Sequence, residues 1–304
     1  MNNHLFLVLF LNSFIVFSVN AKFDFSDKNT KAIYGVDDRQ FVDCESSQKI
    51  REISKSVAMI IEKKNIKQND HTTKFFADSL SVQNICSEER FAKHLSAGVC
   101  TGFLVGPDLL ASAGHCFLDK LDCQNQLIVF NILVKNEVED GIIIPNENIY
   151  ECKEIVSQFY DSSNIMDFVV IRLKRKVHEA KVLKMRTSGE LSLKDKVFMI
   201  GHPLGIPLVV TRSTKILDNS GPHSFSAELD SFSGNSGSPV INSKTFKVEG
   251  ILVRGEEDFV QNQSLQCYHS IVYNLESRES TASQNKSQGE SVTRISDILP
   301  FIKR

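Results

Sequence analysis

The chain has 304 residues, enough for one large hydrophobic core or two smaller ones, and 41% of them are hydrophobic, as is typical of globular proteins. The formal net charge is -2 and the sequence pI is ≈ 6.5. A charge so close to balance argues against a nucleic-acid-binding protein and against a protein with a basic, membrane-binding face.

The first 21 residues differ from the rest. An apolar stretch covers residues 5–19, and the small residue Ala21 follows where a signal peptidase would cut. We therefore expect a signal peptide at 1–21, followed by a possible short leader at 22–31. The alternative, an uncleaved anchor helix, has an apolar stretch that is short for a span of about 20 residues. The mature protein is expected to be secreted or periplasmic, with no stable membrane insertion.

After the leader, short apolar runs rich in Val, Ile and Phe alternate with Gly, Pro, Asn and Asp, which predicts many short antiparallel strands. The runs cover residues 56–61, 99–105, 127–134, 168–173, 196–200, 239–242 and 248–253. A charged, loop-like change near 177–191 suggests two β units, at 32–180 and 181–304. Within the second, a polar surface loop is expected at 275–291 and a short helix at the C-terminal end.

Ser236 is a candidate nucleophile because it lies in the segment Gly-Asn-Ser-Gly-Ser-Pro. Glycines allow a tight turn whose backbone amides face a reacting carbonyl. We expect the amides of Gly234 and Ser236 to form an oxyanion hole. Taken alone, the segment is also consistent with a Gly/Ser-rich surface turn.

A serine hydroxyl needs a base, and His115 is the candidate because the ordinary pKa of histidine, about 6.5, suits proton transfer near neutrality. Asp167 opens an apolar strand, where an unpaired carboxylate would be costly to bury. It is therefore the candidate partner that orients the histidine. An exposed aspartate at a strand start is the alternative for this residue on its own.

The seven cysteines fit an exported protein with disulfides. Cys100 and Cys116 flank a predicted hairpin, and a bridge between them would hold the loop of His115. Cys123 with Cys152 is a possible second bridge, and the pairing of the other three, Cys44, Cys86 and Cys267, stays open. The sequence has no CxxC pair, so neither a zinc site nor a thioredoxin-like motif is expected, and acyl transfer to a serine requires no metal or organic cofactor.

Together these segments resemble the trypsin-like (chymotrypsin-fold) serine peptidases, and within them the bacterial branch that includes glutamyl endopeptidases. The resemblance runs from about Ile33 to Gly255 and has the family's order of His, Asp and Ser. It implies an all-β fold of two antiparallel six-stranded β-barrels, with His115 and Asp167 on the first and Ser236 on the second. Asn235 stands where trypsins have the aspartate that pairs with a newly cut amino terminus, so that route of activation is not expected.

The resemblance also suggests a primary specificity pocket. Asp230 lies six residues before the candidate nucleophile, where trypsins have an acidic pocket floor, and this predicts a preference for Arg or Lys before the cut. Leu252 replaces the histidine that helps glutamyl endopeptidases to receive a carboxylate. The predicted pocket residues are Asp230, Ser231, Val253, Arg254 and Gly255.

These features predict an exported serine endopeptidase that acts on proteins or peptides as a monomer. One alternative is a secreted protein with the protease fold that binds a partner and has lost catalysis. A secreted esterase is a weaker one, because the order of the three residues and the all-β pattern differ from the α/β-hydrolases.

Overall fold

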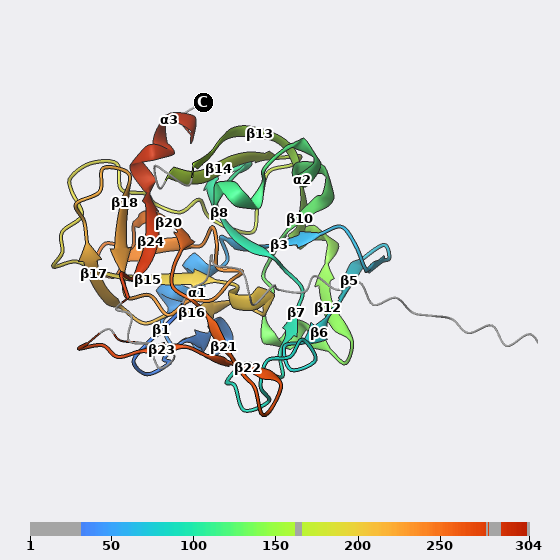
Figure 1. Ribbon diagram of the computed structural model, residues 1–304. Coiled ribbons are helices and arrows are strands. Elements are labelled where there is room, and N and C mark those ends of the chain that lie inside the picture. The colour runs from blue at the N-terminus through green and yellow to red at the C-terminus, as the bar shows by residue number, and fades with distance from the viewer. Residues whose placement is uncertain (1–31, 162–165, 278, 280–286, 303–304) are drawn as a thin grey trace, which may run out of the picture.

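The computed structural model describes residues 32–161, 166–277, 279 and 287–302. The predicted signal peptide at 1–21 and leader at 22–31 lie outside this part of the chain. Two groups of antiparallel strands lie side by side in Figure 1, with most of the cyan and green strands towards the right and most of the orange and red ones towards the left.

Six antiparallel strands form the first barrel and close in the order β10-β13-β14-β9-β8-β3. Apolar residues face both sides of several of these strands, because one side fills the barrel and the other packs against the rest of the protein. The strands are β3 (Val57–Glu62), β8 (Cys100–Gly106), β9 (Leu109–Ser112), β10 (Gln126–Phe130), β13 (Ile149–Asp161) and β14 (Met166–Leu173).

The second barrel also has six antiparallel strands. They run in the order β17-β18-β24-β20-β19-β15, and an additional pairing of β17 with β15 closes them. This confirms the prediction of two six-stranded barrels, and a short helix, α3 (Leu299–Ile302), ends the described chain. The strands are β15 (Lys196–Gly201), β17 (Thr214–Asp218), β18 (Ser224–Ala227), β19 (Pro239–Asn242), β20 (Val248–Arg254) and β24 (Glu290–Arg294).

The start of the described chain packs on the second barrel, although the sequence assigned it to the first unit. β1 (Ile33–Tyr34) pairs with β23 (Val272–Tyr273), and β2 (Gln40–Phe41) pairs with β16 (Val209–Val210), which joins β15. Arg39 helps to hold this segment, since it is buried with its guanidinium 4.0 Å from the ring centre of Phe232. Residues 32–41 therefore pack with the second barrel and not with the rest of the predicted unit at 32–180.

The predicted polar loop at 275–291 also differs at its end. Glu290 and Ser287 are buried, and Glu290 is the first residue of β24. Its carboxylate accepts hydrogen bonds from the Tyr34 hydroxyl and the Ala32 amide, which offset the cost of burying a charge. Polar composition alone suggested a solvated loop. Residues 278 and 280–286 of this loop lie outside the described part of the chain.

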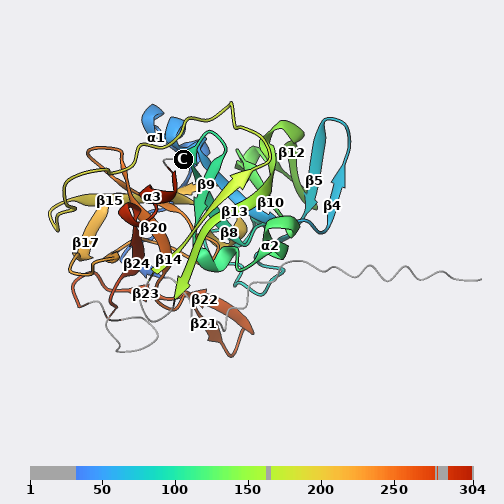
Figure 2. The same ribbon diagram turned by 90° about the horizontal axis from the view of Figure 1, so that it is seen from above.

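Small elements extend the two barrels. A second sheet contains β11, β12, β5 and β4, and two-stranded sheets form from β6 with β7 and from β21 with β22. The long strand β13 and the helices α1 and α2 are seen best from above (Figure 2). The bounds are α1 (Gln48–Ser54), β4 (Ile66–Gln68), β5 (Thr72–Phe76), β6 (Asp78–Ser79), β7 (Leu95–Ser96), α2 (Lys120–Asn125), β11 (Glu137–Val138), β12 (Gly141–Pro145), β21 (Phe259–Asn262) and β22 (Cys267–Ser270).

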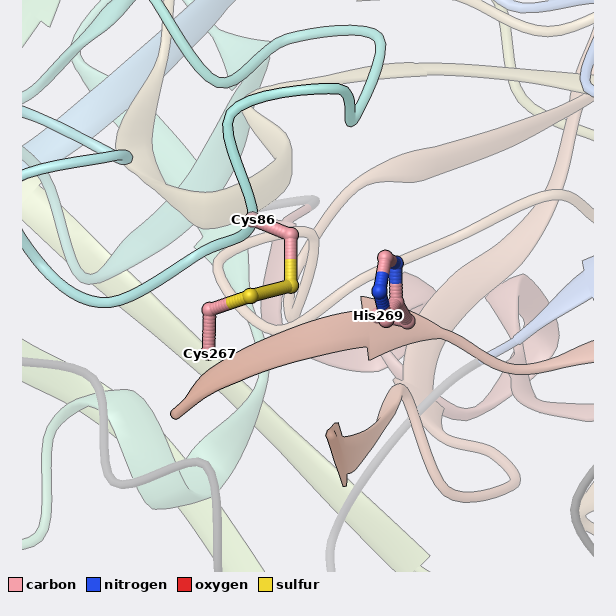
Figure 3. A group of neighbouring side chains, drawn as sticks. All are labelled: Cys86, Cys267 and His269. Carbon is pink, nitrogen blue, oxygen red and sulfur yellow. A yellow bond between two sulfur atoms is a disulfide. The ribbon is translucent and has the colours of Figure 1, made fainter. Parts of the chain in front are cut away.

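Three disulfide bridges cross-link the described chain: Cys86–Cys267, Cys100–Cys116 and Cys123–Cys152. The first settles the pairing that the sequence left open, and it joins a loop near the first barrel to β22 (Figure 3). Cys44 is a free, exposed cysteine. Within the described residues, no helix combines the length and the apolar character needed to cross a membrane.

Candidate active site

His115 lies in a short 3-10 helix, Gly114–Cys116, that directly follows β9. Gly114 lets this turn pack closely on the long strand, because a Cβ atom there would overlap the Phe159 carbonyl oxygen. The Cys100–Cys116 bridge ties the other side of the turn to β8. Strand packing and the disulfide thus hold the backbone of His115 from both sides, which limits misplacement of its ring.

Asp167, near the start of β14, meets His115 through two hydrogen bonds. Its Oδ1 accepts from the His115 backbone N–H at 3.1 Å, and its Oδ2 lies 2.8 Å from His115 Nδ1. Asp167 has no exposed surface, as expected of a carboxylate that needs a partner. An ionised carboxylate only accepts hydrogen bonds, so Nδ1 carries the proton and Nε2 has its lone pair available.

Ser236 lies in a turn of the second barrel that docks on the first. The flanking residues Gly234 and Gly237 have φ angles of 89° and 91°, in the region that favours glycine. The Ser236 carbonyl accepts from the Thr101 N–H at 2.8 Å. A Cβ atom at Gly237 would overlap the Thr101 carbonyl, so the close contact with β8 requires glycine.

The Cys100–Cys116 bridge places the histidine and the serine turn in one neighbourhood. A ring nitrogen of His115 lies within 4.8 Å of both of its sulfur atoms, and Cys116 Sγ is 3.9 Å from the Ser236 carbonyl oxygen. The structure therefore brings the three predicted residues together where the two barrels meet.

The peptides of the serine turn have an orientation that suits the predicted oxyanion hole. The Ser233 carbonyl accepts from the Leu204 N–H at 2.5 Å, and the Asn235 carbonyl accepts from the Ser238 N–H at 2.9 Å. The C=O and N–H of a trans peptide point in opposite directions. The N–H groups of Gly234 and Ser236 belong to the same two peptides as these carbonyls. They therefore point away from the two hydrogen bonds and are not used by them.

His202 is a buried histidine that packs against this turn. Its Nδ1 lies 2.9 Å from the Ile206 carbonyl oxygen, and burial lowers its pKa to about 4. A Cβ atom at Gly234 would lie 2.6 Å from the His202 carbonyl oxygen. His202 is therefore a neutral structural residue that fixes the position of the turn.

The predicted pocket floor, Asp230, is buried beside the amino-terminal segment. Its Oδ1 accepts from the Tyr34 N–H at 2.8 Å, and burial raises its pKa to about 7. Ser231 is also buried, and its N–H donates to the Ala32 carbonyl. Asp230 and Tyr34 line a cavity of about 230 Å³ on this side of the barrel, and none of the three candidate catalytic residues lines it.

The other predicted pocket residues lie at the end of β20 and point in different directions. Val253 packs in the hydrophobic core, whereas Arg254 Nη2 lies 3.8 Å from Asp167 Oδ2. Gly255 faces Glu290, whose carboxylate would overlap a Cβ atom at this position. Sequence reasoning missed Glu290 because it lay in a polar stretch. Its one signal was its place two residues before the apolar Val292 in the last strand.

Two groups of cysteine and histidine have metal-ligand spacing. They are Cys86 with Cys267 and His269, shown in Figure 3, and Cys100 with His115 and Cys116. In each group the two sulfurs are bonded to each other and present no thiolate. His269 Nδ1 lies 3.2 Å from a carboxylate oxygen of Glu89, so a carboxylate already contacts its ring.

Two closed six-stranded barrels, with a histidine, an aspartate and a serine gathered where they meet, define the chymotrypsin-like fold of serine peptidases. Residues 100–251 match the model of the trypsin-like peptidase domain, which spans half of the chain, and the chain belongs to this family.

A solved structure supports the fold. It is described as Glu endopeptidase in complex with MPD and is 12% identical, with a TM-score of 0.50 over 89% of this chain and 97% of that chain. No curated protein matches the sequence. A trypsin-like peptidase domain implies substrates that are proteins or peptides.

Proposed function

We propose that this protein is an exported serine endopeptidase with Ser236 as nucleophile, His115 as general base and Asp167 as the orienting carboxylate. The observation that carries the proposal is the bonding of the His115 ring to a fully buried Asp167, beside the turn that holds Ser236. This arrangement has the parts that acyl transfer needs. It involves no cofactor.

In this mechanism Ser236 Oγ attacks the scissile carbonyl carbon and His115 Nε2 takes the hydroxyl proton. The amides of Gly234 and Ser236 stabilise the negative charge on the tetrahedral intermediate. His115 then gives the proton to the leaving amine, and an ester forms on Ser236. Water then attacks the carbonyl carbon of this ester while His115 takes its proton. The proton returns to Ser236 Oγ, and the carboxylic acid and the free enzyme are released. Asp167 keeps the imidazole in the required tautomer.

We propose a preference for Arg or Lys before the scissile bond, with a buried carboxylate as its recognition group. Asp230 is the predicted group, and Glu290 is a second candidate because its carboxylate adjoins Gly255 at the end of β20. Tyr34 lies between them, with its N–H on Asp230 and its hydroxyl on Glu290. Ser231 and Val253 would then shape the pocket wall through their backbone.

Asp230→Asn and Glu290→Gln separate the two candidates. Removing the buried carboxylate that pairs with the Arg or Lys side chain of the substrate leaves that side chain without its partner, which costs several kcal/mol. The variant that lacks the recognition carboxylate should therefore lower kcat/KM for peptides with Arg or Lys by about 100-fold. The measurement is cleavage of a peptide library, with the residue before each cut read by mass spectrometry. The sequence assigns the effect to Asp230→Asn, and an unchanged kcat/KM in this variant would mean that the cavity lined by Asp230 is separate from the active site. An effect in Glu290→Gln alone would reassign the pocket, and cutting after another residue would exclude the preference.

We also propose export with removal of the segments at 1–21 and 22–31. Ala32 is fully buried, and its nitrogen lies 3.2 Å from Glu290 Oε1. An ammonium group freed at Ala32 would pair with this carboxylate, at a site different from the one that trypsins use. We expect amino-terminal sequencing of the purified active enzyme to begin at Ala32. A chain that begins at Lys22 and is fully active would rule out removal of the leader.

A further inference from the structure

The guanidinium of Arg254 lies beside the carboxylate of Asp167, and the two residues come from different barrels. Arg254 Nη2 is 3.8 Å from Asp167 Oδ2, the same oxygen that lies 2.8 Å from His115 Nδ1. Asp167 is fully buried, whereas 22% of the Arg254 side chain is exposed. The histidine and the arginine therefore share one carboxylate oxygen.

Two other residues near this contact, Val253 and Thr293, give the Asp167 carboxylate no charged partner. Val253, the preceding residue of β20, is buried and has no polar side-chain atom. Thr293 on β24 does have a hydroxyl near Asp167, but it donates to the backbone carbonyl oxygen of Asp167 at 3.1 Å. A buried carboxylate needs compensation of its charge, and a cation within 4 Å supplies it.

We propose that Arg254 is a positioning residue that sets the pH range of catalysis by sharing the Asp167 carboxylate with His115. The inference rests on the proposed peptidase function of the same site. It changes the role expected from the sequence, in which Arg254 belonged to the wall of the substrate pocket.

The sign of the effect follows from the order of the charges. When His115 takes up a proton, Asp167 lies between two cations, the imidazolium and the Arg254 guanidinium, and these repel each other. The imidazolium is therefore less stable than it would be if residue 254 were uncharged. The neutral, catalytic form of the histidine then persists to lower pH. Arg254 should extend activity towards acid.

Among the described residues, other groups near this carboxylate do not bring a competing charge to it. Tyr160 on β13 is the cross-strand partner of Asp167, and its ring centre lies 6.0 Å from that of His115. Asp161, the next residue, points to the opposite face of the strand by the alternation of side chains. From β24, Thr293 contributes an uncharged hydroxyl.

Arg254→Met tests the proposal because methionine is unbranched and uncharged. We expect the pH of half-maximal kcat/KM on the acid side to rise by about one unit, with a smaller change in the maximum. Arg254→Lys keeps the charge on a different donor and should restore at least half of the difference. Arg172→Met is the matched control, since Arg172 on β14 pairs instead with Asp108 and Glu154 and should leave the acid side unchanged.

A double variant makes the test specific to Asp167. In the residual activity of Asp167→Asn, adding Arg254→Met should move the acid side by less than a third of the shift seen in the wild-type background. An unmoved acid side in Arg254→Met, with a higher KM for acidic peptides, would make Arg254 a substrate-binding residue and overturn the proposal. An inactive wild-type enzyme would instead refute the peptidase function.

Discussion

Ser236→Ala should lower kcat/KM for a cleaved peptide by roughly 10⁵- to 10⁶-fold, the loss expected when the nucleophile of a serine, histidine and aspartate unit is removed. Without the hydroxyl no acyl-enzyme forms, and only binding and the oxyanion hole remain. The measurement is the initial rate of peptide cleavage at several substrate concentrations, with equal amounts of purified wild type and variant.

The control for this change is Ser213→Ala, which removes a hydroxyl from an exposed serine bonded to Ser243. It should cut at the wild-type rate. The thermal unfolding midpoint of Ser236→Ala should stay within a few degrees of wild type, because the variant loses a single oxygen atom and keeps the backbone of the turn. A Ser236→Ala enzyme with more than a tenth of wild-type activity would mean that Ser236 is not the nucleophile.

Asp167→Asn should lower kcat by about 10⁴-fold with little change in KM. The asparagine side chain has nearly the same shape, but its amide can donate to His115 Nδ1 and so favour the tautomer that has its proton on Nε2. In that tautomer the histidine cannot accept the hydroxyl proton of Ser236. Steady-state kinetics at neutral pH on the same peptide measure the effect.

Asp122→Asn is a suitable control for the loss of a carboxylate near the histidine loop. Asp122 is in α2 and accepts from the backbone N–H of Leu118. This change should alter kcat by less than threefold. If Asp167→Asn also stayed within tenfold of wild type, the imidazole would not depend on the carboxylate, and the assignment of Asp167 would be wrong.

Much of the fold could be predicted because its signals are local. The β-branched runs that became β3, β14 and β20 are continuous in sequence, and turn residues separate them. The segments around His115 and Ser236 were also visible, since each needs small residues or glycines next to the functional side chain. The resemblance to a family then supplied the arrangement of two barrels, which local patterns alone do not give.

Other features depend on contacts between distant parts of the chain. Cys86 and Cys267 are 181 residues apart, and spacing alone does not select this pair from the possible ones. Glu290 is buried beside Tyr34 and Ala32, which come from the other end of the sequence.

The two predicted pocket charges show the same limit. Counting back from Ser236 located Asp230 in the chain, but the direction of its side chain depends on Tyr34. The same holds for Arg254, whose neighbour Asp167 lies in the other barrel.

The central claim is that Ser236 is a nucleophile activated by His115. An alkyl fluorophosphonate tests it most directly, because this reagent modifies activated serines and leaves ordinary hydroxyl groups unmodified. Peptide mapping of the mature enzyme by mass spectrometry should show one adduct, on Ser236, and His115→Ala should abolish it. Wild-type protein that folds but gains no adduct, or an adduct on a different serine, would contradict the claim and favour a secreted binding protein with a protease fold.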